Sequence, residues 1–148
     1  MTALHLARPD DLEKLLPLVA AYHATEGIVQ DEASRRAALM PLLDGVPQGA
    51  VWLIGPRAAP LGYIAIGTGW SIELGGMDAF IDEFFIRENL RGRGIGTEAL
   101  SALAQALKAQ GVVALHLEVG RDNAAARSIY QRLGFAPRDG FSLMTCRL

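Results

Sequence analysis

The sequence predicts a single mixed α/β domain, and three observations carry this prediction. Hydrophobic residues make up 51% of the 148 positions and charged residues 20%, which excludes a disordered chain. Segments with the alternating pattern of strands are interspersed with segments of helical periodicity. Near residues 94–110 a helical segment joins two of the strands, so these two can pair in parallel, whereas strands joined by short turns pair antiparallel.

Hydrophobic periodicity, with Gly and Pro at segment ends, places the elements in order. Pro9 opens the first helix and Gly27 ends it, while Pro17 is expected to kink it. The last segment alternates only weakly. The complete prediction comprises strands over 2–7, 50–54, 61–68, 77–86 and 112–119, helices over 9–27, 31–43, 94–110 and 123–133, and a terminal hairpin over 135–148.

The charge balance and the cysteine content exclude several classes of function. The chain has 14 Lys and Arg against 16 Asp and Glu, which argues against a dedicated nucleic-acid-binding protein. Cys146 is the one cysteine, so an intrachain disulfide is excluded, and no His or Cys spacing indicates a metal site. No apolar run approaches the roughly 20 residues of a membrane span, and we expect a cytoplasmic protein without a membrane partner.

A glycine-rich loop precedes the longest predicted helix. Gly92, Gly94 and Gly96 allow the backbone to turn tightly and to approach a ligand closely. The free N–H groups at the helix start favour an anion, and Arg91 and Arg93 add positive charge beside them. We interpret this loop as a phosphate-binding site; the alternative is a plain turn with two solvated arginines.

Two other phosphate-binding motifs fit this loop less well. A Walker loop requires a Gly-Lys-Ser/Thr sequence, which does not follow here. Gly94, Gly96 and Ala99 fit a variant of the dinucleotide fingerprint, and Glu118 lies near the expected acidic position. However, the charged residues 87–93 separate the strand from the glycines, and too little chain follows for the second half of such a fold.

Two motifs resemble the GNAT family of N-acetyltransferases. Residues 91–96, Arg-Gly-Arg-Gly-Ile-Gly, resemble the family's pyrophosphate loop, R/Q-x-x-G-x-G/A. A later segment is similar to the family helix N-x-x-A-x-x-x-Y-x-x-x-G-F, through Asn123, Ala126, Tyr130, Gly134 and Phe135. The two motifs occur in the family's order, about 30 residues apart.

The resemblance implies a fold, a donor and a set of donor-binding residues. The fold would be a mixed, mostly antiparallel sheet with a splayed parallel pair, flanked by about four helices. Acetyl-CoA would lie where strands 77–86 and 112–119 separate, and its acetyl group would pass directly to a primary amine. The residues assigned to acetyl-CoA are Phe84, Phe85, Ile86, Arg91, Gly92, Arg93, Gly94, Ile95, Gly96, Thr97, Asn123 and Tyr130.

Acetyl transfer to an amine requires a base and an acid. Tyr130 is the candidate acid for the departing thiolate; the alternative is a core tyrosine. Glu83 and Asp82 are the candidate bases, and we favour Glu83; the alternative is a salt-bridged pair at a strand edge. By alternation the two carboxylates are expected on opposite faces, with Phe84 and Ile86 on the Asp82 face. Adjacent carboxylates on a partly buried strand suit a raised pKa or attraction of a cationic amine.

The acceptor side is less defined by the sequence. His23 and Glu26 end the first helix, where this family often forms its acceptor wall, and Trp70 and Glu73 precede the cleft strand. These four residues are candidate acceptor contacts, or ordinary surface and core residues. His116 is expected to be a buried, hydrogen-bonded histidine; the alternative is a catalytic role.

The acidic residues near these positions favour a small cationic acceptor, such as a polyamine, an amino acid or an aminoglycoside. They are Glu26, Asp31, Glu32, Glu73, Asp82 and Glu83. A protein N-terminal acetyltransferase is a rival within the class, and a CoA-binding module without turnover is a rival from another. Family members are often dimers, so the resemblance is compatible with a homodimer.

Overall fold

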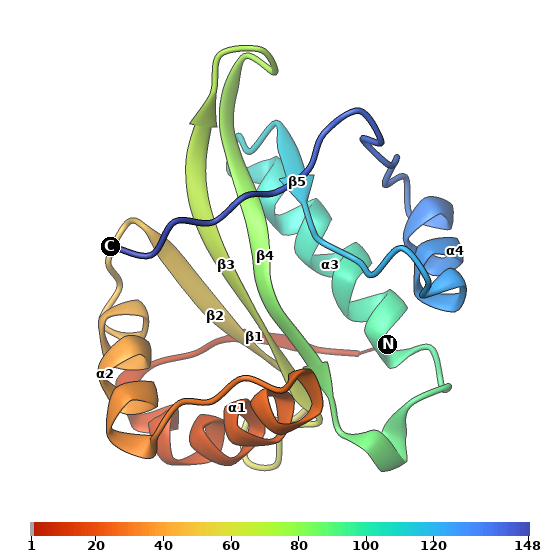
Figure 1. Cartoon of the computed structure of the whole chain (residues 1–148). Coiled ribbons are helices and arrows are strands. Elements are labelled where there is room, and N and C mark those ends of the chain that lie inside the picture. Colours follow the sequence, from red (N-terminus) through yellow and green to blue (C-terminus); the bar gives the residue numbers. More distant parts are fainter. Residues whose placement is uncertain (1) are drawn as a thin grey trace. The chain divides into compact units, whose positions relative to one another are not determined.

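The structure, a computed structural model, describes residues 2–148. It divides into two compact units, the first ending at Glu118 and the second being Val119–Leu148. The second unit contains α4 (Ala124–Arg132). The first unit contains β1 (Leu4–Leu6), η1 (Pro9–Asp11), α1 (Leu12–Glu26), α2 (Glu32–Leu43), β2 (Gly49–Ile54), β3 (Gly62–Ser71), β4 (Gly76–Ile86), η2 (Glu88–Leu90), α3 (Ile95–Ala109) and β5 (Ala114–His116), as Figure 1 shows.

The five strands form one mixed sheet in the order β1-β2-β3-β4-β5. The pairs from β1 to β4 are antiparallel, and β4 pairs with β5 in parallel after the α3 crossover, as the sequence predicts. The parallel register comprises three positions, from Asp78 opposite Ala114 to Phe80 opposite His116. Beyond Phe80, β4 continues to Ile86 without β5 beside it. The predicted splayed parallel pair is therefore confirmed.

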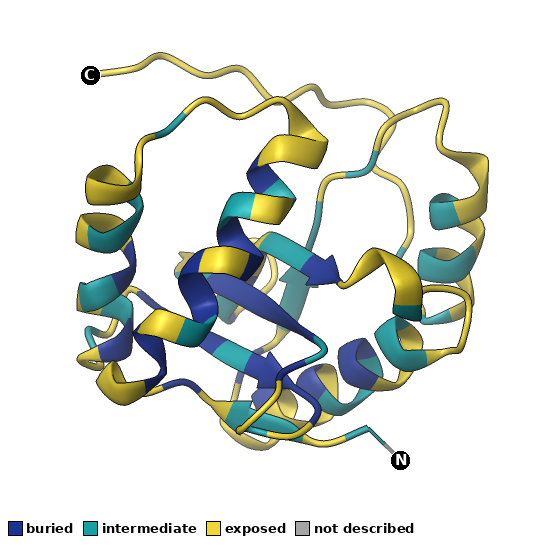
Figure 2. Ribbon diagram, turned by 90° about the horizontal axis from the view of Figure 1, so that it is seen from below, coloured by how far each residue is buried: buried dark blue, intermediate teal, exposed yellow. Residues whose placement is uncertain are grey.

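Helices cover both faces of this sheet. On one face, α1 and α2 bury a core that includes Leu15, Leu18 and Tyr63. On the other face lies α3, whose buried stripe includes Leu100 and Leu103 (Figure 1). Figure 2 shows the burial concentrated on the strands and on the helix sides that face them. Both apolar stripes follow the periodicity that the sequence shows.

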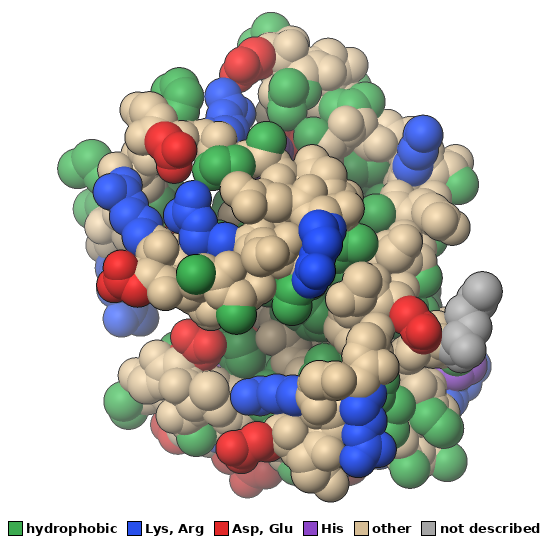
Figure 3. Space-filling model, turned by 90° about the vertical axis from the view of Figure 1, so that its right-hand side faces the viewer, with side chains coloured by type: hydrophobic (Ala, Val, Ile, Leu, Met, Phe, Trp, Pro, Cys, Tyr) green, Lys and Arg blue, Asp and Glu red, His purple; other side chains and the backbone are tan. Residues whose placement is uncertain are grey.

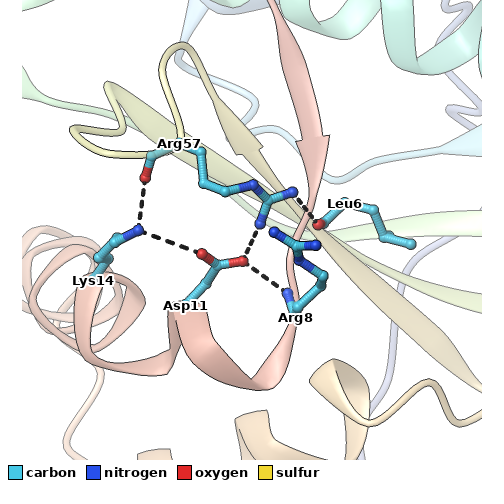
Figure 4. A network of polar contacts seen from close by, with 5 residues as sticks. All are labelled: Leu6, Arg8, Asp11, Lys14 and Arg57. Carbon is cyan, nitrogen blue, oxygen red and sulfur yellow. Dashed lines mark hydrogen bonds and ion pairs between the residues drawn. The ribbon is translucent and has the colours of Figure 1, made fainter.

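The buried carboxylate of Asp11 links the start of α1 to the β2–β3 turn through hydrogen bonds. Asp11 is 2% exposed and accepts hydrogen bonds from the Arg8 N–H and from the Arg57 guanidinium (Figure 4). Lys14 Nζ lies 3.6 Å from Asp11 Oδ1, and Arg57 also donates to the Leu6 carbonyl. Burial acts to raise the pKa of Asp11, but these hydrogen bonds and the two cations outweigh it and lower the pKa.

Two predicted strands differ from the structure. The strand predicted over 112–119 is reduced to β5, because β4 diverges after Phe80 and leaves the following residues without a pairing partner. The hairpin predicted over 135–148 is wrong: these residues have no helix or strand. Their alternation buries no apolar face, since Phe141 and Met144 are 70% and 92% exposed. An alternating pattern gives a strand only where a neighbouring strand can pair with it.

Candidate active site

The glycine-rich loop has the backbone that an anion site needs. Gly92 and Gly94 adopt φ of 78° and 80°, in the left-handed region that favours glycine. Glu98 N–H makes the first bond of α3, to the Gly94 carbonyl at 3.0 Å. The N–H groups of Ile95, Gly96 and Thr97 therefore have no acceptor within the helix. Around the two glycines the space that a Cβ would occupy is open, so a ligand can reach the backbone.

The third glycine serves packing. A Cβ at Gly96 would lie 3.2 Å from Phe84 Cζ, so its absence lets α3 pack closely on β4. Arg91 donates from Nε to the Ile86 carbonyl at 3.0 Å, and its guanidinium lies 5.4 Å from the Phe85 ring centroid. These contacts join the loop directly to the end of β4. The fit of the loop to a pyrophosphate is thus supported by an open, cationic turn at a helix start.

A β-bulge in β4 corrects the predicted faces of the two carboxylates. Glu83 lies opposite Ala65 and Ile81 lies opposite Ile66, so Asp82 is an extra residue without a partner on β3. Glu83 lies toward α1, where it contacts His23, and Phe84 and Ile86 lie toward Gly96 of α3. The prediction that Asp82 and Glu83 point to opposite faces, with Phe84 and Ile86 on the Asp82 face, assumed an uninterrupted alternation, which the bulge interrupts. A bulge breaks the period-two count on which it depended.

Glu83 lies at the centre of a hydrogen-bonded cluster beneath α1. His23 Nε2 lies 2.7 Å from Glu83 Oε2, and the Tyr63 hydroxyl donates to Glu83 Oε1 at 2.7 Å. His23 is 4% exposed and Tyr63 is fully buried. Arg35, from α2, donates from Nε to His23 Nδ1 at 3.2 Å. Burial, followed by the charge of Glu83, raises the pKa of Tyr63, so the phenol remains a hydrogen-bond donor.

Asp82 has a different environment from that of Glu83. Partial burial is the largest cause that raises the pKa of Asp82, and repulsion from Glu83 and Glu118 raises it further. His23 opposes this shift. Burial is therefore the main cause of the raised pKa of Asp82, and the adjacent carboxylate of Glu83 adds to it.

The structure separates the acceptor candidates. His23 joins the Glu83 cluster, and Glu26 lies exposed one turn further along α1. Trp70 pairs with Met77, six residues before Glu83, which places it about 20 Å away along β4. Trp70 is 74% exposed and Glu73 lies in the turn beyond it, so neither belongs to the cluster.

Two of the acidic residues have structural roles in α2, and His116 pairs elsewhere. Asp31 caps α2 by accepting the Ser34 N–H at 2.7 Å, and Glu32 pairs with Arg36 along the helix at 4.0 Å. His116 Nε2 lies 3.1 Å from Asp78 Oδ2, so the expected hydrogen bond is confirmed, but the ring is half-buried rather than buried. Figure 3 shows acidic and basic side chains intermingled on one face, as the balanced composition predicts.

In the second unit, Asn123 and Tyr130 belong to α4. The Asn123 side chain caps the helix by accepting the Ala126 N–H at 3.2 Å. Tyr130 is half-buried, and its ring packs edge-on against Phe135 with centroids 6.0 Å apart. Burial raises the pKa of Tyr130, so the hydroxyl keeps its proton at neutral pH.

Arg35 and Tyr63 are the cluster residues that sequence reasoning missed. Arg35 is an ordinary helix residue in the sequence, and Tyr63 reads as one aromatic residue of an apolar strand. Their roles depend on the packing of α2 on α1 and of β3 on β4, for which no local motif exists. Within residues 2–148, no group of three His, Cys, Asp or Glu side chains could hold a metal ion, and no helix is long and apolar enough to span a membrane.

Comparison with known proteins identifies the family. The family model described as "Acetyltransferase (GNAT) family" matches residues 17–135, most of the chain. The chain therefore belongs to the GNAT family, a family of acyltransferase enzymes that generally use acetyl-CoA. The resemblance carried by the two motifs is thus confirmed.

Individual relatives agree with this assignment. An uncharacterized N-acetyltransferase of Bacillus subtilis is 40% identical over 62 residues, which are 42% of this chain and 40% of that protein. An L-methionine sulfoximine/L-methionine sulfone acetyltransferase of Pseudomonas aeruginosa is 32% identical over 90 residues, which are 60% of this chain and 52% of that protein. The chain thus spans about half, or less, of the length of these curated relatives.

A solved structure extends the likeness to nearly the whole chain. An integron cassette protein from the mobile metagenome of Cole Harbour Salt Marsh superposes with a TM-score of 0.84 at 31% sequence identity. The match covers 98% of this chain and 90% of that chain. The sheet order and the helices described above are therefore shared over almost the full length.

Proposed function

We propose that the chain is an acetyl-CoA-dependent N-acetyltransferase whose acceptor is a primary amine on a small, cationic molecule. One observation carries the proposal: the edge of β4 from Ile81 to Ile86 has no partner beyond β5, and the Gly92–Gly94 turn follows it after the short η2 helix. Unpaired backbone groups on such an edge suit an amide-containing arm, which binds like an added strand. The turn that follows suits a pyrophosphate.

The residues in this region fit both the acetyl-pantetheine arm and the pyrophosphate of acetyl-CoA, the proposed donor. Backbone groups of Phe84 and Ile86 would pair with the acyl carbonyl and the pantetheine amides. The N–H groups of Ile95, Gly96 and Thr97 would hold the pyrophosphate, with Arg91 and Arg93 beside it. Asn123 and Tyr130 are assigned to the donor by the motif alone.

The transfer itself requires four events. Glu83, directly or through a water molecule, takes a proton from the acceptor ammonium and leaves a neutral amine. The amine nitrogen attacks the acetyl carbon, and a strand N–H such as that of Phe84 stabilises the oxyanion. This attack forms the C–N bond, the C–S bond then breaks, and Tyr130 gives its proton to the departing thiolate. Finally the nitrogen gives up its second proton, through water, to the Tyr130 phenolate, and Glu83 releases its proton to the solvent.

The acceptor class follows from the charge near the proposed base. Asp82 and Glu83 are two adjacent carboxylates at the bulge, and Glu26 is the last residue of α1, the helix that carries His23. Such a site attracts an ammonium group and disfavours an acid. A free amino acid is one acceptor of this kind, in agreement with the name of the Pseudomonas relative, which acts on methionine derivatives.

Thiol release from acetyl-CoA with a panel of amines tests the proposal. Polyamines, free amino acids, aminoglycosides and peptides with free N-termini form the panel. We expect turnover with a small cationic amine. Turnover with peptides only would favour protein N-terminal acetylation, and acetyl-CoA binding without turnover would favour a sensor module.

Two variants test the donor site and the acid. Gly94→Val places a side chain in the open turn, and we expect loss of acetyl-CoA binding in a calorimetric titration while the fold survives. Unchanged affinity would reject the pyrophosphate site.

Tyr130→Phe keeps the ring and removes the proton, and kcat should fall by roughly 10²–10⁴ with acetyl-CoA affinity little changed. Full activity would leave Tyr130 a core residue.

A further inference from the structure

Two hydrogen bonds in sequence lead from α2 to the proposed base, and a third reaches it from β3. Arg35 Nε donates to His23 Nδ1 at 3.2 Å, and His23 Nε2 lies 2.7 Å from Glu83 Oε2. The other oxygen, Oε1, accepts from the Tyr63 hydroxyl at 2.7 Å. Four different elements thus converge on one carboxylate: α2, α1, β3 and β4.

The chemistry of these atoms fixes the position of the His23 proton. A guanidinium has N–H donors and no acceptor, so the hydrogen bond from Arg35 requires a lone pair on His23 Nδ1. A neutral imidazole carries one proton, which must then lie on Nε2. That proton points at Glu83 Oε2, where an acceptor is needed. The other tautomer would set two donors against each other at Nδ1 and two acceptors against each other at Nε2.

We propose that Arg35 and His23 are positioning residues for the Glu83 carboxylate: Arg35 sets the His23 tautomer, and the Nε2 proton of His23 then holds Glu83. This proposal rests on the proposed function, in which Glu83 is the base. Each carboxylate oxygen has two lone-pair sites, and the protein uses one on each. The carboxylate is therefore held at both oxygens and keeps one lone pair on each for a proton.

Burial makes this arrangement effective. The His23 and Glu83 side chains are 5% and 18% exposed, so water competes weakly for their hydrogen bonds. The charged and titratable groups that act on the cluster come from every neighbouring element: Arg35 from α2, Tyr22 from α1, Tyr63 from β3, Asp82 from β4 and Glu118 after β5. A base held in one orientation reacts from a near-attack geometry, which a freely rotating carboxylate reaches only part of the time.

The proton position can be measured without any assay of activity. In ¹⁵N-labelled protein, two-bond ¹H–¹⁵N correlation spectra distinguish a protonated Nε2 from a protonated Nδ1. We expect His23 to show a protonated Nε2 and a bare Nδ1 in the wild type and in Arg36→Gln. Arg36 is the matched control because it is the next residue of α2 and pairs with Glu13 at the surface. A protonated Nδ1 in the wild type would overturn the proposal.

Kinetics test whether the two residues act through Glu83. Arg35→Gln should lower kcat/KM about fivefold to tenfold, as expected for one lost hydrogen bond, with KM for acetyl-CoA unchanged. In a Glu83→Gln background the same change should have no further effect. An equal loss in both backgrounds would overturn the proposal. Arg35→Lys, which keeps a cationic donor, should recover part of the activity and serves if Arg35→Gln fails to fold.

Two substitutions at His23 separate positioning from packing. His23→Gln retains a donor near the place of Nε2, whereas His23→Asn places its amide near Nδ1. We expect His23→Gln to keep more activity than His23→Asn at similar stability; the reverse order would contradict the proposal. If Glu83→Gln is itself fully active, the proposed base fails, and spectra of the wild type and of Arg35→Gln still decide whether Arg35 sets the tautomer: a protonated Nε2 that persists unchanged in Arg35→Gln would contradict it.

Discussion

Two buried carboxylates of the first unit are satisfied in opposite ways. Asp11 is surrounded by cations, with the Arg57 guanidinium on one oxygen and Lys14 near the other. Glu83 accepts from a histidine N–H and a tyrosine hydroxyl, and its neighbour in sequence is a second carboxylate, Asp82. The charge of Asp11 is paired with an arginine and a lysine, whereas the ion-pair partner of Glu83 is a histidine, which is charged only when it is protonated.

This difference indicates which carboxylate stabilises the fold and which is available for chemistry. A buried carboxylate that is paired with cations is costly to disrupt and offers little to a ligand. Carboxylates held by neutral donors remain able to attract an ammonium group and to accept a proton. Asp11 connects η1 to the β2–β3 turn, whereas Glu83 lies at the proposed reaction site.

The largest expected effect is on catalysis at Glu83. Glu83→Gln keeps the shape and removes the basic form, so kcat/KM should fall by roughly 10²–10⁴. The loss should shrink at high pH, where more of the amine is already neutral. Steady-state rates over a pH series check this. Glu13→Gln, an exposed ion-pair residue, is the matched control and should be fully active. If Glu83→Gln lowers kcat/KM only slightly and Asp82→Asn lowers it strongly, Asp82 rather than Glu83 is the base.

The next effect is on stability at Asp11. Its pKa is lowered in the folded protein, so its contribution to stability is present above the unfolded value of 3.8 and is lost as the pH falls through the folded value. At pH 7, Asp11→Asn should lower the free energy of unfolding by about 3 kcal/mol. Denaturant titrations at pH 7 and below pH 3.8 check this. The deficit should narrow at low pH, and Asp10→Asn, its exposed neighbour, should show none. A deficit that is constant with pH would contradict the ion-pair account.

The smallest effect has the opposite sign. The pKa of Asp82 is raised, so the contribution of this one group to stability is greatest below the unfolded value of 3.8 and declines as the pH rises through the folded value. Asp82→Asn avoids this decline and should be slightly more stable than the wild type at pH 7, by less than about 1 kcal/mol because solvent screens the partly exposed group. Thermal melts at pH 3 and pH 7 measure it. Destabilisation at pH 7 would mean that Asp82 makes favourable contacts.

Most of the first unit could be predicted from the sequence because its signals are local. Periodicity located the helices, and Gly27 and Gly94 lie at the predicted helix ends with left-handed φ. The glycine loop was located for the same reason, and the role of Glu83 as the base stays a prediction. The Arg57–Asp11 and Arg35–His23 contacts join segments 46 and 12 residues apart and leave no local pattern. The bulge at Asp82 carries no Gly or Pro that would reveal it.

The hairpin prediction for the C-terminal segment was wrong for a related reason. Residues 135–148 alternate weakly, and alternation alone does not supply a strand to pair with. β5 likewise ends at His116, because β4 diverges there, although the apolar run in the sequence continues. Strand pairing depends on where neighbouring strands lie, and the hydrophobic periodicity of one segment does not predict that position.

A crossed measurement on two variants tests the division between the two carboxylates most directly. For Glu83→Gln we expect a free energy of unfolding within about 1 kcal/mol of the wild type, because the amide can still bond His23 and Tyr63, together with the loss of kcat/KM described above. For folded Asp11→Asn we expect a wild-type kcat/KM per folded molecule and the stability deficit. Strong destabilisation of Glu83→Gln with full activity, or inactive but stable Asp11→Asn, would contradict the account.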